Sequence, residues 1–348
     1  MTALLQADAL EALLTEIAAG AAGLDAAPAF PAAAFAGLGR IGALAGDLPF
    51  AGQLELVRAV AGADGSVGRI LDGHLNAAER LRLLGPPEQD GVSGDLAAIA
   101  RGELRLGLWG ADPVPGEGEP ARVHGQPGAR RVSGVKVFCS GAGGVDRAVM
   151  LARGPDGAGA PWLVYVDLTA GVELDRSWFR GGGMRASESH RVCFDDAQVI
   201  AVLGEPGELA RDPWFSRDAI RTAASWAGMA DTAQGCAVRA LAARPGAGAL
   251  EGLAAGRMLT AQGTIDLWLA RAATREHPDR ALSVHLRDAI AGAATAILDE
   301  AARACGSRPF ATGSALDRAR RDLELLLLQH RLDPLVARRG REILEAAR

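Results

Sequence analysis

Lysine is almost absent from this sequence: Lys136 is the single lysine among 37 basic residues. The other basic residues are arginines, and they are spread along the chain rather than gathered in one block. With a formal net charge of −5, nothing in the charge pattern indicates a nucleic-acid partner. Because alanine and glycine are abundant, we attribute the scarcity of lysine to coding bias rather than to function.

Cysteine is also scarce, and its spacing is uninformative for metals. The four cysteines are Cys139, Cys193, Cys236 and Cys305. No two of them form a C-x-x-C pair, and no cysteine–histidine cluster has the spacing of a zinc site, so no metal centre is expected. We expect reduced thiols, most of them buried, in a cytoplasmic protein.

Two targeting features are missing as well. No apolar run approaches about 18–20 residues without a proline or a charge, so no membrane span is expected. The N-terminal stretch is acidic and amphipathic and lacks the basic start of a signal peptide. Both absences favour a cytoplasmic location.

Three zones of different composition follow one another along the 348 residues. Residues 1–105 show helical periodicity, residues 106–205 are rich in glycine and valine with short alternating runs, and residues 206–348 return to long helical patterns. A chain of this length is enough for two or three packed units. We predict an N-terminal helical domain, a middle β domain and a C-terminal helical bundle.

Local signals predict where several elements begin or turn. Asp64 or Ser66 is a plausible N-cap for a helix. The pair Ser133-Gly134 is predicted to be the turn between two short strands. Three more strands are predicted, at 148–153, 161–168 and 190–196. Several short strands joined by turns indicate a small barrel or sandwich, and the long helices after residue 211 indicate a bundle.

Five segments, in this order, carry a resemblance to a known family. They are "DGSVGRILDGH", "IARGELRLGLWGADP", "RVSGVKVFCSGAGGVDRAVMLAR", "GGMRASESHRVCFDDAQV" and "DRARRDL". Together they resemble the motifs of acyl-CoA dehydrogenases, over nearly the whole chain. The resemblance implies an α+β fold with an N-terminal helical domain, a central small β-barrel and a C-terminal four-helix bundle. It also implies a flavoprotein that binds FAD and dehydrogenates acyl thioesters.

The third segment would carry the flavin contacts. Strand alternation puts Lys136, Phe138 and Ser140 on one face. An aromatic ring and a hydroxyl on one face can pack on a flavin ring and donate a hydrogen bond toward its N5 edge, and the resemblance gives Phe138 and Ser140 these roles. Cys139 lies between them in the same cofactor-binding stretch. The alternative is a core phenylalanine beside a solvent-facing serine.

Trp109, Gly110 and Ala111 lie where the family's backbone and a threonine touch the pyrimidine side of the flavin. Ala111 replaces that threonine, so the hydroxyl contact is lost and only backbone N–H groups remain to bind there. For Trp109 the alternative is a residue of the β-domain core, because tryptophan is often largely buried.

The family completes its FAD site with a neighbouring subunit, so the resemblance implies a homodimer or homotetramer. By position, Arg244 and Gly306 would reach the neighbour's cofactor, since a diphosphate suits a guanidinium and bare backbone N–H groups. The family's usual R-x-x-F-G and the glutamine before its glycine pair are absent. The alternative is a helix-ending arginine and a C-cap glycine.

The last bundle helix of the family opens with Arg-Asp and reaches its catalytic glutamate eight residues later. Here Arg321-Asp322 leads, at the same spacing, to His330. The run 325–328 is all leucine, which predicts a helix that is buried all round. With an ordinary pKa of about 6.5, a histidine is usable as a general base. We expect His330 to be the catalytic base, and the alternative is a capping or core histidine.

Three functions remain open. The first is an FAD-dependent dehydrogenase acting on an acyl thioester, with an unknown electron acceptor. The second is a two-component monooxygenase supplied with reduced flavin, and the third is a binding protein that keeps the fold without the chemistry. The missing glutamate and Ala111 favour the last two, whereas Phe138 and Ser140 favour retained flavin. Two second-rank candidates are His74, expected to be packed, and Arg185, expected to contact substrate or only its own loop.

Overall fold

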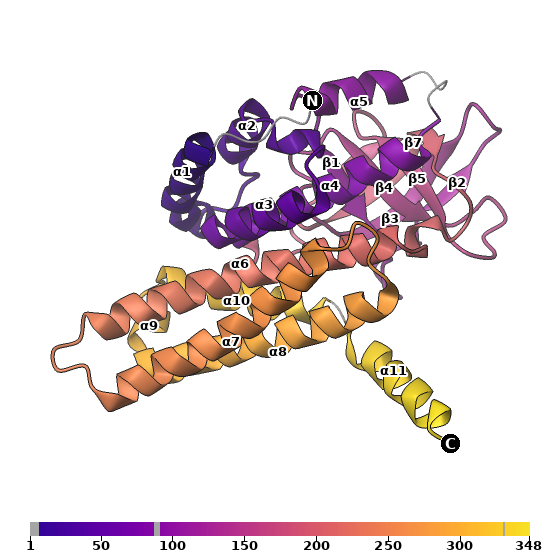
Figure 1. Ribbon diagram of the computed structural model, residues 1–348. Helices are drawn as coiled ribbons and strands as arrows, with labels where there is room; N and C mark the ends of the chain where they lie inside the picture. Colours follow the sequence, from indigo (N-terminus) through magenta and orange to yellow (C-terminus); the bar gives the residue numbers. More distant parts are fainter. Residues whose placement is uncertain (1–6, 87–90, 330) are drawn as a thin grey trace.

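The computed structural model describes residues 7–86, 91–329 and 331–348. Helices come first, strands follow, and helices return (Figure 1). The first helices are α1 (Ala7–Ala26), α2 (Ala32–Arg40), η1 (Ala43–Ala45), α3 (Phe50–Ala63), α4 (Gly65–Leu84) and α5 (Val92–Ala100). Asp64 accepts a hydrogen bond from the backbone N–H of Val67 at 3.0 Å, so one of the two N-caps predicted for α4 is confirmed.

The middle of the chain forms a seven-stranded sheet. Its strands are β1 (Leu106–Trp109), β2 (Arg122–His124), β3 (Arg131–Cys139), β4 (Arg147–Ala152), β5 (Trp162–Asp167), β6 (Val172–Asp175) and β7 (His190–Val202). They pair in the order β1-β4-β5-β7-β3-β2, with β6 on β7. The strands predicted at 148–153, 161–168 and 190–196 are confirmed as β4, β5 and β7.

The turn predicted at Ser133-Gly134 is wrong, because β3 runs through both residues. Gly134 has a φ of 117° and lies at an irregularity in the pairing of β3 with β7. A Cβ at this position would lie 2.7 Å from the carbonyl oxygen of Pro120. The glycine therefore permits a bulge and a close backbone approach, where the sequence pattern resembles a turn.

Four long helices lie side by side in the C-terminal part (Figure 1). They are α6 (Trp214–Ala242), α7 (Ala249–Ala273), α8 (Arg280–Cys305) and α10 (Ala315–Leu328). Shorter elements are η2 (Arg185–Ser187), η3 (Glu208–Ala210), α9 (Arg308–Ala311) and α11 (Asp333–Ala346). In Figure 1, α11 points away from the rest of the molecule. None of its residues is buried.

Charged and polar side chains meet where α6 packs on α4, and we call this set the buried charge network. Its buried members are Asp72, Asn76, Arg80, Asp218 and Arg221, and the partly buried Glu79 completes it. Arg80 donates to Asp218 at 2.5 Å, and Arg221 donates to Glu79 at 2.7 Å. Burial raises the pKa of Asp218 to about 6, although Arg80 acts in the opposite direction. Such charges are tolerated in a core because each one is paired.

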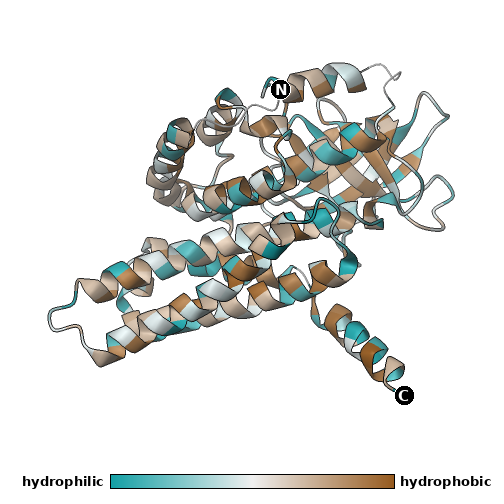
Figure 2. Ribbon diagram, viewed as in Figure 1, coloured by the Kyte–Doolittle hydropathy of each residue, from teal (hydrophilic) through white to brown (hydrophobic). Residues whose placement is uncertain are grey.

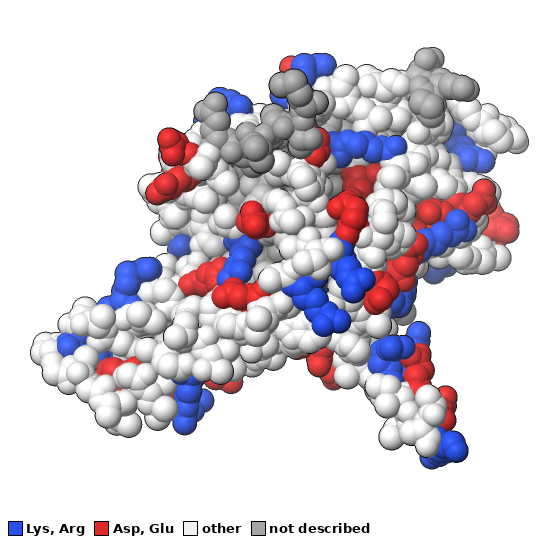
Figure 3. All heavy atoms as spheres, viewed as in Figure 1, with Lys and Arg blue, Asp and Glu red and all other residues white. Residues whose placement is uncertain are grey.

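The surface mixes both signs of charge. Figure 3 shows acidic and basic groups interspersed over the visible face, without one patch of a single sign. Figure 2 shows hydrophobic residues on the strands of the sheet and along the bundle helices. Among the described residues one helix, α8, has the length and hydropathy of a membrane span, and 50% of its most apolar window is buried in the protein. A core helix passes the same test, and α8 packs on α6 and α7.

Candidate functional site

A pocket of about 330 Å³ lies where the end of β3, the loop before β7, α4 and the end of α10 meet. We call it the central pocket. It is lined by Arg69, Ala111, Phe138, Ser140, Phe179, Met184, Ser189, Leu325, Leu326, Leu328 and Gln329. Three residues predicted from the sequence to bind the cofactor, Ala111, Phe138 and Ser140, are therefore brought together at one cavity.

Phe138 has an unusual backbone for a bulky residue. Its φ is 53°, in the left-handed region, and its side chain is 45% exposed although it lies on a strand of a packed sheet. The pairing of β3 with β7 is irregular between Lys136 and Cys139, which marks a bulge. A bulge re-aims a side chain, and backbone strain of this kind clusters at functional sites. Here it turns the ring away from the sheet core and into the central pocket, edge to face with Trp178 at a centroid distance of 4.8 Å.

The same bulge breaks the alternation predicted for this strand. Lys136 does not share a face with Phe138: it is fully buried and donates to the Gly110 carbonyl at 3.1 Å and to Asp112 at 2.8 Å. Burial lowers the pKa of Lys136, although Asp112 acts in the opposite direction. Cys139 is also fully buried, and its side chain lies in the hydrophobic core rather than in the pocket wall.

Three serine hydroxyls form a chain whose direction is fixed. Ser187 donates to the Met184 carbonyl at 2.7 Å, which uses its single proton. Ser189, 2.7 Å away, must therefore donate to Ser187. Ser189 then has no proton left for its other neighbour, so Ser140 donates to Ser189 at 2.9 Å. Ser140 consequently presents oxygen lone pairs, and not a proton, to the central pocket.

Trp109, Gly110 and Ala111 hold the loop beside that serine. Trp109 is 1% exposed, and its indole N–H donates to the Ser140 carbonyl at 3.0 Å. The side chain of Trp109 thus lies in the core of the β domain, which was the alternative to a flavin contact. The Ala111 carbonyl accepts from the N–H of Val137 at 3.3 Å, which keeps Ala111 at the pocket wall.

Arg69 supplies the positive charge of the central pocket. It is the one cationic side chain among the described lining residues. Its Nη1 donates to Asp72 at 2.6 Å, whereas its buried Nε has no hydrogen-bond partner among the described residues. Because Asp72 belongs to the buried charge network, the network holds the guanidinium of Arg69 in place at the pocket wall.

The loop that carries Met184 is fastened to α10. Asp322 accepts a hydrogen bond from the backbone N–H of Met184 at 2.5 Å, and Arg321 pairs with Asp25 at 2.7 Å. Gly183 lies so close to the helix that a Cβ there would be 2.0 Å from the Arg321 carbonyl oxygen. Burial raises the pKa of Asp322 to about 7, although the Met184 N–H acts in the opposite direction.

The end of α10 borders the open side of the pocket. Of the run 325–328 only Leu326 is buried, Leu325 and Leu327 are partly buried and Leu328 is 78% exposed, so the prediction that the helix is buried all round here is wrong. Leu328 and Gln329 line the pocket. They are exposed because no helix or strand of the described part of the chain packs over them at this open end of the cavity. His330, the predicted catalytic base, lies outside the described residues, and its role stays a prediction.

Arg244 and Gly306 lie together, but at the opposite end of the bundle. Arg244 follows α6, whose 29 residues span roughly 43 Å. Its Nη2 donates to the Ala304 carbonyl at 2.8 Å, and Gly306 is the C-cap of α8 with a φ of 71°. A hollow of about 530 Å³ that includes Arg244 and Arg308 opens beside them. The structure therefore separates these two residues from Phe138 and Ser140.

The two second-rank candidates differ in kind. His74 is fully buried: its Nε2–H donates to the Leu44 carbonyl at 2.8 Å, and its Nδ1 accepts from the N–H of Leu106 at 3.0 Å. Burial lowers the pKa of His74 to about 4, so the ring is a neutral packing element. Arg185 instead lines a second pocket of about 460 Å³.

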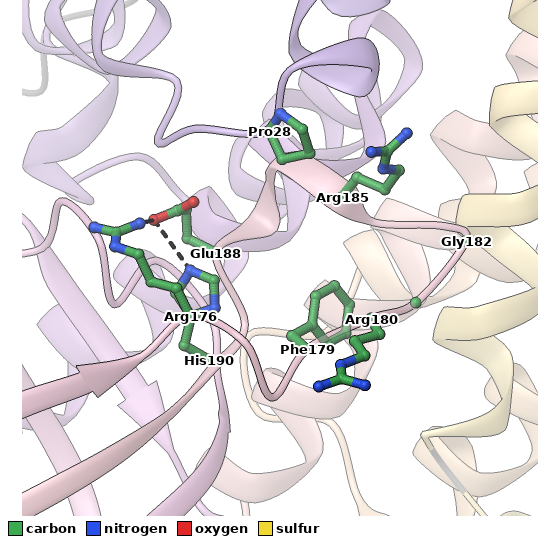
Figure 4. A pocket seen from close by; sticks show the side chains of 9 residues that line it. Pro28, Arg176, Phe179, Arg180, Gly182, Arg185, Glu188 and His190 are labelled. Atoms are coloured by element: carbon green, nitrogen blue, oxygen red, sulfur yellow. Dashed lines mark hydrogen bonds and ion pairs between the residues drawn. The ribbon is translucent and has the colours of Figure 1, made fainter.

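This second pocket was not found by sequence reasoning, and we call it the arginine pocket. Its charged lining residues are Arg176, Arg180, Arg185, Glu188 and His190 (Figure 4). Phe179 lines both this pocket and the central pocket, so the two cavities are neighbours. Three arginines between positions 176 and 185 were a signal that could have revealed it.

Unusual backbone marks both pockets. Among the described residues, Phe138, Met184, Glu188 and Asp196 are the non-glycine residues with positive φ. The first two line the central pocket, and Glu188 lines the arginine pocket. A left-handed conformation costs on the order of 1–3 kcal/mol when the residue is not glycine. The strain is therefore concentrated where ligands would bind.

Neither a family model nor a curated protein matches the sequence. Solved structures do match. FMN-bound TdsC from Paenibacillus sp. A11-2 is 20% identical with a TM-score of 0.79, covering 97% of each chain. The methanesulfinate monooxygenase MsuC from Pseudomonas fluorescens is 22% identical with a TM-score of 0.81, covering 99% of this chain and 98% of MsuC.

A nitrososynthase from Micromonospora carbonacea var. africana is also similar, with 23% identity and a TM-score of 0.77, covering 91% of this chain and 89% of that chain. These similarities confirm the predicted fold class, the α+β acyl-CoA dehydrogenase-like fold. At such identities they establish the fold alone.

Proposed function

We propose that this protein is a flavin-dependent monooxygenase that takes up reduced flavin, and that the central pocket is its reaction site. The observation that carries the proposal is Phe138, an exposed aromatic ring that a bulged, left-handed backbone holds at a cavity beside Ser140. Among proteins of similar fold, TdsC, a dibenzothiophene monooxygenase, and MsuC, a methanesulfinate monooxygenase, support this reaction class.

The residues of the central pocket fit the ring system of a flavin. Phe138 offers an aromatic surface, and Arg69 offers a positive charge backed by Asp72. Ser140 presents lone pairs, so it suits a ligand that donates a proton. Reduced flavin carries an N–H at N5, whereas oxidised flavin has only an acceptor there. The direction of the serine chain therefore favours the reduced form.

When bound, reduced flavin supplies the two electrons with which one atom of dioxygen enters the substrate and the other leaves as water. The role of the protein is to position the flavin and the substrate. Leu325, Leu326 and Leu328 give the pocket an apolar wall, against which the uncharged part of a substrate can pack. We expect His330 to move the proton that accompanies the reaction.

Acyl-thioester dehydrogenation with FAD is the competing function. It follows from the resemblance in sequence, with His330 in place of the usual glutamate. It requires oxidised flavin, whose N5 accepts a hydrogen bond, and Ser140 in the observed chain offers no proton. For this reason we propose monooxygenation rather than dehydrogenation, and the His330 variants described below distinguish the two reactions.

We also propose that the protein is a homodimer or homotetramer. Exposed leucines on α7 support this: Leu250 is 78%, Leu253 50%, Leu259 66% and Leu267 74% exposed. Several large apolar side chains on the outer side of one helix are more typical of an interface than of a free surface.

Flavin binding tests the proposal directly. The purified protein is titrated anaerobically with reduced FMN and FAD, and in parallel with the oxidised forms. We expect tighter binding of a reduced flavin, a loss of about tenfold in affinity for Ser140→Ala, and no change for Ser133→Ala, which alters a serine of the same strand outside the pocket. A protein that takes up neither flavin in either redox state would rule the proposal out.

His330 variants then separate the two reactions. His330→Ala is expected to abolish turnover while flavin remains bound. If the protein is a dehydrogenase, His330→Glu should retain anaerobic reduction of bound flavin by an acyl-CoA from a panel of chain lengths. If it is a monooxygenase, no acyl-CoA reduces the flavin in any variant, and His330→Glu instead disturbs product formation that depends on oxygen.

A further inference from the structure

The arginine pocket has the charge of an anion site. It has a volume of about 460 Å³, and among the described residues its lining contains three arginines and one carboxylate, Glu188. In Figure 4, Arg176, Glu188 and His190 gather on one side of the cavity, whereas Arg180 and Arg185 come from the loop on its other side. A cavity lined mainly by one sign of charge attracts ligands of the opposite sign.

His190 gives the second, independent sign of a missing ligand. It is 7% exposed, yet neither ring nitrogen has a hydrogen-bond partner among the described residues. Its Nε2 lies 3.2 Å from a Glu188 oxygen, within ion-pair range, so Nδ1 is the ring nitrogen that has neither a hydrogen bond nor an ion pair among the described residues. Leaving a buried polar group unpaired costs about 1–3 kcal/mol, and a ligand in the pocket would remove that cost.

Glu188 does not cancel the positive charge. Burial alone would raise its pKa, but His190 and Arg176 together lower the pKa of Glu188 below its usual value. The carboxylate is therefore charged and occupied by Arg176, with which it forms an ion pair. Glu188 therefore orients His190 and Arg176, and it does not pair with Arg180 or Arg185.

Arg185 is the most available of these cations. Arg180 uses one donor on the Ser177 carbonyl at 2.8 Å, whereas Arg185 makes no hydrogen bond or ion pair with its side chain among the described residues. A planar guanidinium presents a fork of N–H groups that matches two oxygens of a phosphate, sulfonate or carboxylate.

We propose that the arginine pocket binds an oxyanion group, such as a phosphate, sulfonate or carboxylate, of the ligand that occupies the central pocket. Phe179 lies in the wall of both cavities, so a ligand with its reactive end beside Phe138 can place an anionic end beside Arg185 and His190. The oxyanion belongs either to the substrate, an assignment that rests on the proposed function, or to the phosphate of the flavin.

Calorimetric titration of the flavin-free protein with inorganic pyrophosphate tests the site itself. We expect saturable binding at fixed ionic strength, weakened about tenfold by Arg185→Gln. Arg131→Gln is the matched control, because Arg131 is an exposed arginine outside the pocket, and it should bind like the wild type. His190→Gln should also weaken binding, and its fold is checked by circular dichroism.

The two sources of the oxyanion are separated with FMN and riboflavin. If the flavin phosphate occupies the site, Arg185→Gln weakens FMN binding and leaves riboflavin binding unchanged. If the substrate does, Arg185→Gln changes neither, and pyrophosphate binds equally well to the flavin-loaded protein. No saturable pyrophosphate binding by the wild type, or equal binding by Arg185→Gln, would overturn the proposal. Because the titration needs no flavin, its result stands even if the protein proves not to be a flavoprotein.

Discussion

The two ends of the helical bundle are built in opposite ways. At the end beside the sheet, α10 is fastened to the loop before β7 by Asp322 and to α1 by Arg321, and the central pocket lies within these contacts. At the other end, the turn between α6 and α7 projects from the molecule (Figure 1). There Arg244 is 40% exposed, and a Cβ at Gly306 would meet nothing within 4 Å.

The comparison of the two ends shows which binding site a single chain can form by itself. The central pocket has aromatic, hydroxyl, apolar and cationic groups in place, and its wall is held by buried hydrogen bonds. Arg244 and Gly306 have the chemistry of a diphosphate site, but they face open space. If they take part in binding a cofactor, a second chain must supply the opposite wall.

The largest effect on stability is expected at Gly183, where the loop before β7 packs most closely on α10. In Gly183→Ala the new Cβ would lie 2.0 Å from the Arg321 carbonyl oxygen, and backbone rather than a flexible side chain must move. We expect the free energy of unfolding, measured with denaturant, to fall by about 3 kcal/mol.

Gly256→Ala provides the comparison at the exposed side of α7, where a Cβ would meet nothing within 4 Å. Removing a glycine from a helix interior should stabilise the protein by about 0.5–1 kcal/mol. Equal effects of the two substitutions would mean that the two ends of the bundle do not differ in packing.

The second effect is a pH dependence that arises at the sheet end. The pKa of Asp322 is about 7 in the folded protein against an ordinary value of 3.8, so the folded state holds this proton more tightly than the unfolded chain. The resulting stabilisation is complete below about pH 4 and is lost as the pH rises through about 7. Asp322→Asn keeps an acceptor for the Met184 N–H but cannot ionise. The difference in free energy of unfolding between Asp322→Asn and wild type should therefore change by on the order of 2 kcal/mol in favour of the variant as the pH rises from 5 to 8.

Asp299→Asn, at an exposed position of α8, controls for the loss of one carboxylate and should stay within about 0.5 kcal/mol of wild type. If the difference between Asp322→Asn and wild type does not change with pH, the carboxyl group of Asp322 does not titrate in this range.

The third effect, and the smallest on the folded chain itself, concerns the exposed side of the bundle. Leu267→Asp places a charge on the outer side of α7 without touching a buried residue, since Leu267 is 74% exposed. We expect the monomer's stability to be unchanged and the dissociation constant of the oligomer, from sedimentation at several concentrations, to rise by about tenfold. Val114→Asp makes the same change at an exposed site beside the sheet and should leave the oligomer intact.

Local rules predicted the parts of this fold that depend on neighbours in sequence. The side chain of Asp64 caps α4, as its type and position indicate, and the apolar runs of β4, β5 and β7 are long enough to be recognised by periodicity. The resemblance in motif order predicted the fold class, and it picked out Ala111, Phe138 and Ser140, which line one pocket.

What the sequence could not predict depends on contacts made after folding. Gly134 and Phe138 both deviate from a regular strand because β3 bulges against β7; a glycine within a strand can indicate the first bulge, but nothing in the sequence beside Phe138 indicates the second. The direction of the serine chain depends on the Met184 carbonyl, which a left-handed residue presents. Arg176 and Arg185 become one site only because the loop folds back beside His190.

The buried charge network has a consequence for how this chain can change over evolutionary time. Replacing Asp218 alone would strand Arg80, which has no other ion-pair partner among the described residues, at a cost of about 3–5 kcal/mol, whereas replacing Arg80 alone would leave Asp218 with Arg221 at 3.3 Å. Exchanging all partners together for apolar residues of similar volume can cost little. The order of replacement therefore matters: Arg80 can be lost before Asp218, but Asp218 cannot be lost first without leaving a buried, unpaired arginine. Because Asp72 of this set also pairs with Arg69, a lineage that gave up the network would in the same step lose the carboxylate that holds the cation of its central pocket.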